Sequence, residues 1–113
     1  MSANLKTATP LFSRAKDFAV PEEMMARVLD HLRNIENYYP SWYSAPVRHT
    51  LSAYALYVRS LMGDVDTAKA RNLLNEKPLD DQSLEAIAWI WQVLGDDSAS
   101  AQDVDAIRRH LDN

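Results

Sequence analysis

The chain has 113 residues, a net charge of −4 and no cysteine. The missing cysteine excludes disulfides, thiolate metal ligands and a cysteine nucleophile, and the acidic balance argues against a nucleic-acid binder, which usually carries a basic stripe. Only two glycines are present, too few for the turns of a β-rich fold. No stretch reaches the ~18 to 20 apolar residues that a membrane span needs.

The first third of the chain predicts two helices. One begins near Pro10 within residues 5–18, because proline fits only a first helical turn; a longer helix kinked at this proline is the alternative. The other begins at Pro21, where the pair Glu22-Glu23 complements the helix dipole. Apolar residues at three- and four-residue spacing carry this second helix to about Tyr38.

An aromatic loop follows at residues 38–46, where Pro40 and Pro46 prevent a continuous helix. It holds four aromatic residues within six positions, which is unusual for a connector: Tyr38, Tyr39, Trp42 and Tyr43. Such a cluster could form a surface for a ligand or partner, or it could fold over the end of a helical bundle as a lid. We favour the lid.

Two buried helices are predicted by nearly continuous apolar runs. The central one starts near Pro46 or Val47 and stops at Gly63, and the second covers residues 84–95 and stops at Gly95. A helix that is apolar nearly all round belongs inside a bundle, with other helices packed about it.

Amphipathic helices are predicted after each buried one. Asp64 is expected to cap the first of them, Asp80 or Asp81 to cap the second buried helix, and Ser100 to cap the last helix with Asp103 in a box-like arrangement. The periodicity turns inward Val65, Ala68, Leu73 and Leu74 in one helix and Val104, Ile107 and Leu111 in the last; Asp66, Lys69, Arg71 and Asn72 point outward.

The two buried helices belong to a repeat of about 32 residues, within the range of helical repeats. The alignment pairs Tyr57 with Trp89, Val58 with Ile90, Gly63 with Gly95 and Asp64 with Asp96. Residues 11–12, followed by the helix that starts at Glu22, form an earlier copy. The sequence therefore predicts three hairpins, each an inner helix followed by an outer one.

No residue pattern declares a reaction. The histidines lack the spacing of a helical zinc site: His31, His49 and His110. His49 lies at the mouth of the central helix and could act as a base, but we interpret it as a partly exposed helix-start residue. Trp89 and Trp91 are two positions apart on a helix, so they are expected to face different sides.

Charged pairs are explained by helix ends. The acid pairs Glu22-Glu23, Asp80-Asp81 and Asp96-Asp97 lie at helix starts or turns, where capping accounts for them without any reaction. The basic triplet Arg108-Arg109-His110 has acids beside it and is interpreted as a solvated face.

Three stretches, FAVPEEMMARVLDHLRNI, TLSAYALYVRSLMGD and AKARNLLNE, together with the repeated buried helix, resemble the thioester domain of bacterial alpha-2-macroglobulins. The resemblance covers residues 5–113 and implies an α/α toroid, in which inner and outer helices alternate around a ring. It also implies protease trapping: a protease cuts a bait region, the protein rearranges and a thioester captures the attacker. Bacterial members are generally periplasmic and often lipoproteins tethered to the membrane.

One departure from this family matters. Its thioester joins a Cys and a Gln of a C-x-E-Q motif, and this chain has no Cys, so Gln82, Gln92 and Gln102 have no partner. We therefore assign no catalytic, cofactor-binding or metal-binding residue. Either the motif lies upstream in a parent protein, or the parent is a member that lacks it.

The sequence thus predicts an all-α fold, a partial α/α toroid of about six helices in three inner–outer helical hairpins. Residues 1–113 form a single segment of a larger thioester-type domain, non-catalytic and without a cofactor, in a periplasmic protease-trapping inhibitor. Its expected partners are target proteases through the parent and neighbouring domains, with self-association through open ends and no nucleic-acid or membrane contact. The alternative is a free-standing helical scaffold that binds proteins or peptides. A toroid enzyme is a distant third, because the inner helices offer only Glu85.

Overall fold

The computed structural model describes residues 21–113, and this part of the chain is all-α, as the sequence predicts. Its α-helices are α2 (Glu22–Arg33), α3 (Ala45–Leu61), α4 (Thr67–Leu74), α5 (Leu84–Leu94) and α6 (Ala101–Asp112). Short 3₁₀ turns lie between them: η1 (Ile35–Tyr38), η2 (Leu79–Asp81) and η3 (Ser98–Ser100). The helix expected from Pro10 lies outside the described residues.

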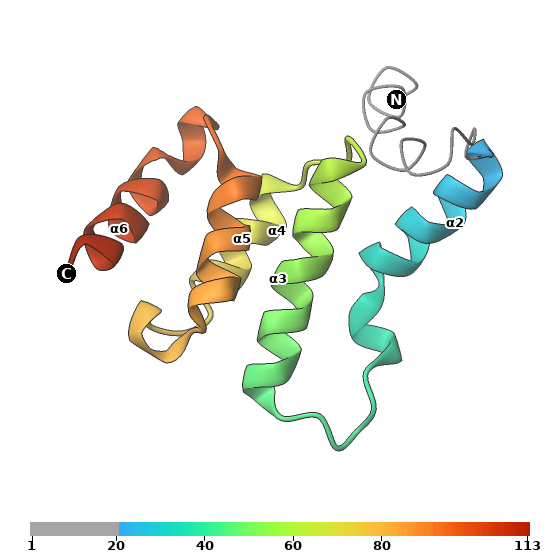
Figure 1. Ribbon diagram of the computed structural model, residues 1–113, viewed down its shortest axis with the longest axis horizontal. Helices are drawn as coiled ribbons and strands as arrows, with labels where there is room; N and C mark the ends of the chain where they lie inside the picture. The colour runs from blue at the N-terminus through green and yellow to red at the C-terminus, as the bar shows by residue number, and fades with distance from the viewer. Residues whose placement is uncertain (1–20) are drawn as a thin grey trace.

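The helices alternate in direction along the chain. Figure 1 shows α3 and α5 side by side and running in the same direction, with α4 returning behind them. α2 lies along the other flank of α3, and α6 returns beside α5. The two helices predicted as inner are therefore adjacent, although α4 separates them in sequence.

α3 is bounded by a serine and a glycine. Ser44 is its N-cap residue, and the Ser44 hydroxyl accepts a hydrogen bond from the backbone N–H of Val47 at 3.4 Å. Pro46 lies in the first turn, where a missing N–H costs nothing. At the other end Gly63 has a φ of 86°, a conformation that favours glycine, and the chain turns there. Gly95 after α5 has a φ of 48°, so each of the two repeated helices is followed by a glycine with a positive φ.

The start of α4 differs from the prediction. Asp66 caps this helix instead of Asp64, and its carboxylate accepts a hydrogen bond from the backbone N–H of Lys69 at 3.1 Å. A cap two residues later changes which side chains face the core. The buried residues are Ala70, Leu73 and Leu74, whereas Val65 and Ala68 are exposed.

The start of α5 also corrects the sequence interpretation. Ser83 caps the helix, and its hydroxyl accepts from the backbone N–H of Ala86 at 3.1 Å. The expectation of Asp80 or Asp81 is wrong because both lie in η2. The extended residue Gln82 then separates that turn from the helix.

α2 ends earlier than expected. Its last residue is Arg33, and the Asn34 side chain donates to the Asp30 carbonyl at 2.9 Å. The chain continues as η1 to Tyr38, which tightens the final turn without extending the α-helix.

The predicted capping box of α6 does not form. Ser100 holds the expected N-cap position, but its hydroxyl donates to Asp97 at 2.6 Å. Asp103 instead accepts a hydrogen bond from the Asn75 side chain at 3.3 Å, which ties α6 to the end of α4. Of the residues expected to face inward, Ile107 is buried, Val104 is half-buried and Leu111 is exposed.

The main hydrophobic core lies between α3, α4 and α5 and reaches α6. Its large, almost completely buried side chains are Leu56, Ile87, Ile90, Leu94 and Ile107. Alanines also reach zero exposure here, and small side chains at contacts let helix axes approach closely: Ala53, Ala70 and Ala86. A smaller cluster of Met25, Leu29 and Met62 joins α2 to the end of α3.

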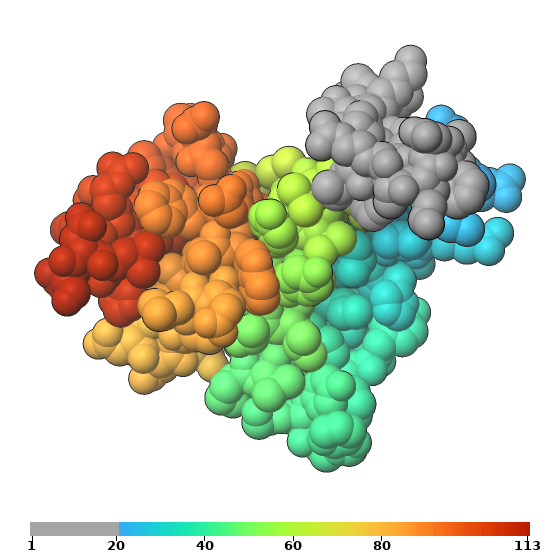
Figure 2. All heavy atoms as spheres, viewed as in Figure 1, coloured from blue at the N-terminus to red at the C-terminus, as the bar shows by residue number. Residues whose placement is uncertain are grey.

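α3 is not buried on every side, which corrects the prediction of a fully enclosed helix. Leu51, Tyr54 and Leu61 are exposed on it. The Tyr54 ring packs against Trp89 of α5, with ring centroids 4.8 Å apart. Figure 2 shows the side chains of α3 and α5 meeting along the length of the two helices. Each helix therefore buries one side and leaves another at the surface.

Ile90→Ala tests this core, because Ile90 has no exposed surface and lies in α5 between α3 and α4. Loss of its buried methyl groups is expected to lower the free energy of unfolding by about 2–5 kcal/mol. Urea denaturation measures the change. The control is Leu84→Ala in the first turn of the same helix, where the side chain is 63% exposed. Equal effects of the two substitutions would contradict the assigned core.

Candidate functional site

A cleft of about 570 Å³ opens beside the first half of α3. η1 and the aromatic loop form one wall, and α4 with the residues after it forms the other. Leu56 and Leu73 supply apolar lining, while Tyr39, His49 and Ser52 supply polar groups. This volume lies within the range of small-ligand sites.

His49 forms part of the cleft wall and is held by α4. Only 4% of the residue is exposed, and its Nε2 lies 3.0 Å from the Leu73 carbonyl. A carbonyl only accepts, so Nε2 carries the hydrogen and Nδ1 of the neutral ring is an acceptor. Residues 21–113 supply no hydrogen-bond partner for Nδ1. The sequence predicted that His49 is partly exposed. This is wrong, because α4 packs over this turn and buries the residue.

Two hydroxyl groups meet in the same wall. The Tyr39 hydroxyl and Ser52 Oγ are 3.0 Å apart, and Ser52 is buried. Burial raises the pKa of the Tyr39 phenol, an effect that the Ser52 hydrogen bond partly offsets, so the phenol keeps its hydrogen at neutral pH. The hydrogen bond between Tyr39 and Ser52 uses the hydrogen of one hydroxyl. The hydrogen of the other hydroxyl remains free to donate.

Charged residues of both signs line the cleft as well. Lys69 donates to Glu36 at 3.2 Å and to the Arg33 carbonyl at 3.1 Å, so this lysine is compensated. Lys77 and Glu76 form no ion pair with the described residues. Among the described residues, the cleft therefore presents two cations without an ion-pair partner, Lys77 and Arg48, and one such carboxylate, Glu76.

Arg48 braces the aromatic loop beside the cleft. Its guanidinium donates to the Tyr43 carbonyl at 3.1 Å and to the Pro40 and Ser41 carbonyls, both at 3.3 Å. Three bonds to one short segment fix the loop against the start of α3. This arginine was not singled out from the sequence, although its position eight residues after Pro40 and two after Pro46 is visible there.

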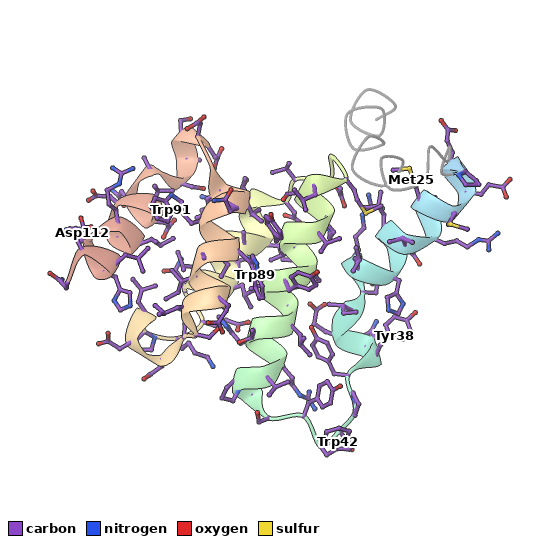
Figure 3. All side chains as sticks on the ribbon, viewed as in Figure 1. Met25, Tyr38, Trp42, Trp89, Trp91 and Asp112 are labelled. Atoms are coloured by element: carbon purple, nitrogen blue, oxygen red, sulfur yellow. The ribbon has the colours of Figure 1, made fainter. Side chains whose placement is uncertain are left out.

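The aromatic residues of the loop divide into two kinds. Tyr39 and Tyr43 are half-buried with ring centroids 6.0 Å apart, as the lid interpretation requires. Trp42 and Tyr38 are exposed instead, Trp42 by 79%. Figure 3 shows Trp42 at the tip of the loop, at the far end from Met25 of α2. The lid is thus confirmed for two rings and wrong for the other two.

The remaining candidates from the sequence lie apart from the cleft. The His31 ring packs against the Tyr38 ring with centroids 4.2 Å apart, and His110 Nδ1 lies 3.6 Å from Asp80 Oδ1. Arg109 pairs with Asp105 at 3.4 Å on the exposed side of α6, as expected of a solvated face. Within residues 21–113, no three His, Asp or Glu side chains converge as metal ligands do.

Two further side chains have structural explanations. Gln82 is buried and donates to the carbonyls of Leu74 at 2.6 Å and Lys77 at 2.9 Å, which satisfies the end of α4. Trp89 and Trp91 lie on different sides of α5, as predicted: Trp89 packs on Tyr54, while Trp91 points toward α6 in Figure 3.

A second charged cluster surrounds the turn between α3 and α4. The Arg59 side chain is only 5% exposed and donates to Asp64 at 2.9 Å and to Asp66 at 3.3 Å. Arg33 of α2 donates to the same oxygen of Asp64 at 2.9 Å. Burial alone raises the pKa of Asp64, but the hydrogen bonds from the two arginines outweigh it and hold the pKa below its ordinary value. The cluster joins three helices and is structural.

Comparisons of the chain with models of known protein families, with characterised proteins and with solved structures gave no match. Among the described helices, none has both the length and the apolar character needed to cross a membrane.

Asp64→Asn tests the charged cluster. The lost charge leaves Arg59 with Asp66 alone, so the free energy of unfolding at pH 7 should fall by about 1–3 kcal/mol. A carboxyl with a lowered folded pKa stabilises above its ordinary pKa of 3.8, and this contribution disappears as the pH falls through the folded pKa. The variant should therefore lose less stability than the wild type between pH 7 and the acid range.

The repeat supplies the control for this substitution. Asp96 follows Gly95 as Asp64 follows Gly63, but it is exposed and forms no ion pair with the described residues. Asp96→Asn should leave both the stability and its pH dependence nearly unchanged in urea titrations. If the two variants lost equally little unfolding free energy between pH 7 and acid pH, the role given to Asp64 would be contradicted.

Proposed function

We propose that this chain is a non-catalytic helical segment of a bacterial alpha-2-macroglobulin-like protease-trapping protein. The sequence resemblance supports this role through the VPEEM motif at residues 20–24 and the AYALYV run in α3. In this role the segment forms part of the α/α toroid of a thioester domain, and the parent is periplasmic and tethered as a lipoprotein.

The observation that carries the proposal is the adjacency of α3 and α5. An inner–outer ring requires each inner helix to lie beside the next inner helix in the same direction, with the outer helix returning behind. α3 and α5 lie side by side in the same direction with α4 returning behind them (Figure 1), and a positive-φ glycine follows both α3 and α5, which supports the proposal. Further hairpins on either flank would extend the same arrangement around the ring.

Any thioester used for capture lies elsewhere in the parent. A thioester needs a cysteine thiol, and this chain has none. The segment would then serve as a scaffold, whose contribution is the rigid placement of neighbouring parts. Target proteases and neighbouring domains are its partners only through the parent.

A free-standing scaffold that binds proteins is the second candidate, favoured by the aromatic loop. Trp42 is 79% exposed on a loop that Arg48 fixes through three hydrogen bonds. Exposed tryptophan on a rigid support is typical of interface hot spots. A natural product of this length alone would favour this candidate over the protease trap.

The natural full-length product tests the protease-trap role. We expect a large exported protein that, mixed with trypsin, blocks cleavage of protein substrates but leaves cleavage of small peptide substrates largely intact, because a caged protease excludes only large molecules. Activity assays with both substrate classes measure this. A product that leaves both activities unchanged, or blocks both equally, would contradict trapping.

Self-association of the isolated chain follows from apolar residues at the ends of the helix row. Leu111 of α6 and Met24 and Val28 of α2 are exposed, and such surface favours contact between copies. Sedimentation velocity should show a mass that rises with concentration. Leu111→Asp should weaken the association, whereas Ala101→Asp, with the same charge at the exposed start of α6, should not. A monomer at all concentrations would contradict this expectation.

A further inference from the structure

We propose that the cleft beside α3 binds a peptide segment that carries a carboxylate next to an apolar side chain. The cleft is built from η1, the aromatic loop, the first half of α3 and the end of α4. Neither its geometry nor its chemistry depends on the protease-trap role.

Donors in the cleft select a carboxylate. The Tyr39–Ser52 pair has one O–H hydrogen left over, and Lys77 adds an ammonium without an ion-pair partner in the described chain. Charge-assisted hydrogen bonds to a carboxylate are about twice as strong as bonds between neutral groups. A carboxylate would accept a charge-assisted hydrogen bond from either donor, whereas a neutral amide would form a weaker one.

Acceptors in the cleft select a peptide over a small free acid. His49 Nδ1 and the Glu76 carboxylate both accept hydrogen bonds, and residues 21–113 give neither a partner. Backbone N–H groups of a peptide supply the missing donors, which a simple carboxylic acid lacks.

The apolar lining fixes where a side chain would go. The apolar lining of the cleft comes from Ala45, which is exposed, and from the small exposed parts of Leu56 (2%) and Leu73 (8%). A leucine-sized side chain next to the acidic residue would pack against this lining. The ligand class is therefore an apolar residue adjacent to an Asp or Glu within a peptide chain.

The walls are already held in place before any ligand arrives. Arg48 fixes the aromatic loop, and the bond between His49 and the Leu73 carbonyl fixes α4 against α3. Lys69 joins η1 to α4 through Glu36. Rigid walls reduce the entropy lost on binding.

Titration of the ¹⁵N-labelled full chain with three probes tests the proposal by NMR. The probes are the blocked peptides Ac-Ala-Leu-Asp-Ala-NH₂ and Ac-Ala-Leu-Asn-Ala-NH₂, and N-acetyl-leucine. We expect the Asp peptide to shift the backbone amides of residues 47–52 and 73–77 with a Kd in the millimolar range. The Asn peptide should bind about tenfold more weakly, because it lacks the charge.

N-acetyl-leucine tests whether the carboxylate must belong to a peptide or can come from a small free acid. It should bind more weakly than the Asp peptide because it offers fewer N–H donors. Equal binding by N-acetyl-leucine would overturn the assignment to peptides, and equal binding by the Asp and Asn peptides would overturn carboxylate recognition. Absence of shifts in these two segments with the Asp peptide would overturn the site itself.

Two matched variants test whether Lys77 is the cation that contacts the peptide carboxylate. Lys77→Gln should weaken the Asp peptide about tenfold and leave the Asn peptide unchanged. Arg108→Gln removes one positive charge from the exposed side of α6 and should change neither. The same loss in both variants would mean that overall charge, and not Lys77, attracts the peptide, and would overturn the assigned contact.

Discussion

The buried guanidinium of Arg59 is the constraint on which the arrangement of the helices depends. A charge with 5% exposure is strongly unfavourable unless it is paired and hydrogen-bonded. Its partners Asp64 and Asp66 both lie in the short link between α3 and α4. The link must therefore bend so that both carboxylates reach back to α3, which sets where α4 begins. Because Arg33 donates to the same carboxylate, α2 is held to this turn as well.

The position of α4 then determines the cleft. Once Asp66 caps it, α4 turns Ala70, Leu73 and Leu74 toward the core, and its last turn reaches the start of α3. There the Leu73 carbonyl meets His49, and a histidine that the sequence places at a helix mouth becomes a buried wall residue. The structural cluster at one end of α4 and the candidate site at the other are thus joined by a single short helix.

Local patterns predicted the helices, the glycine ends and the repeat, because each rests on residues close in sequence. The same reasoning failed where distant residues compete. Asp64 is a suitable cap by position, but two arginines from α2 and α3 bind its carboxylate, and Asp66 caps α4 instead. The burial of His49 and the exposure of Tyr54 likewise depend on which helices pack against α3. The cleft could not be predicted, since its walls come from segments up to about 40 residues apart in the chain.

The cleft and the flanks of the helix row are different kinds of surface. On the flanks, α2 and α6 expose apolar side chains that further hairpins of the proposed ring would cover. The cleft needs no further hairpin, because η1 and α4 already stand on its two sides and α3 forms its base. Addition of neighbours at the flanks would therefore bury Leu111 and Val28 and leave the cleft open. A scaffold role within a larger protein and a peptide site on its surface are compatible in the same fold.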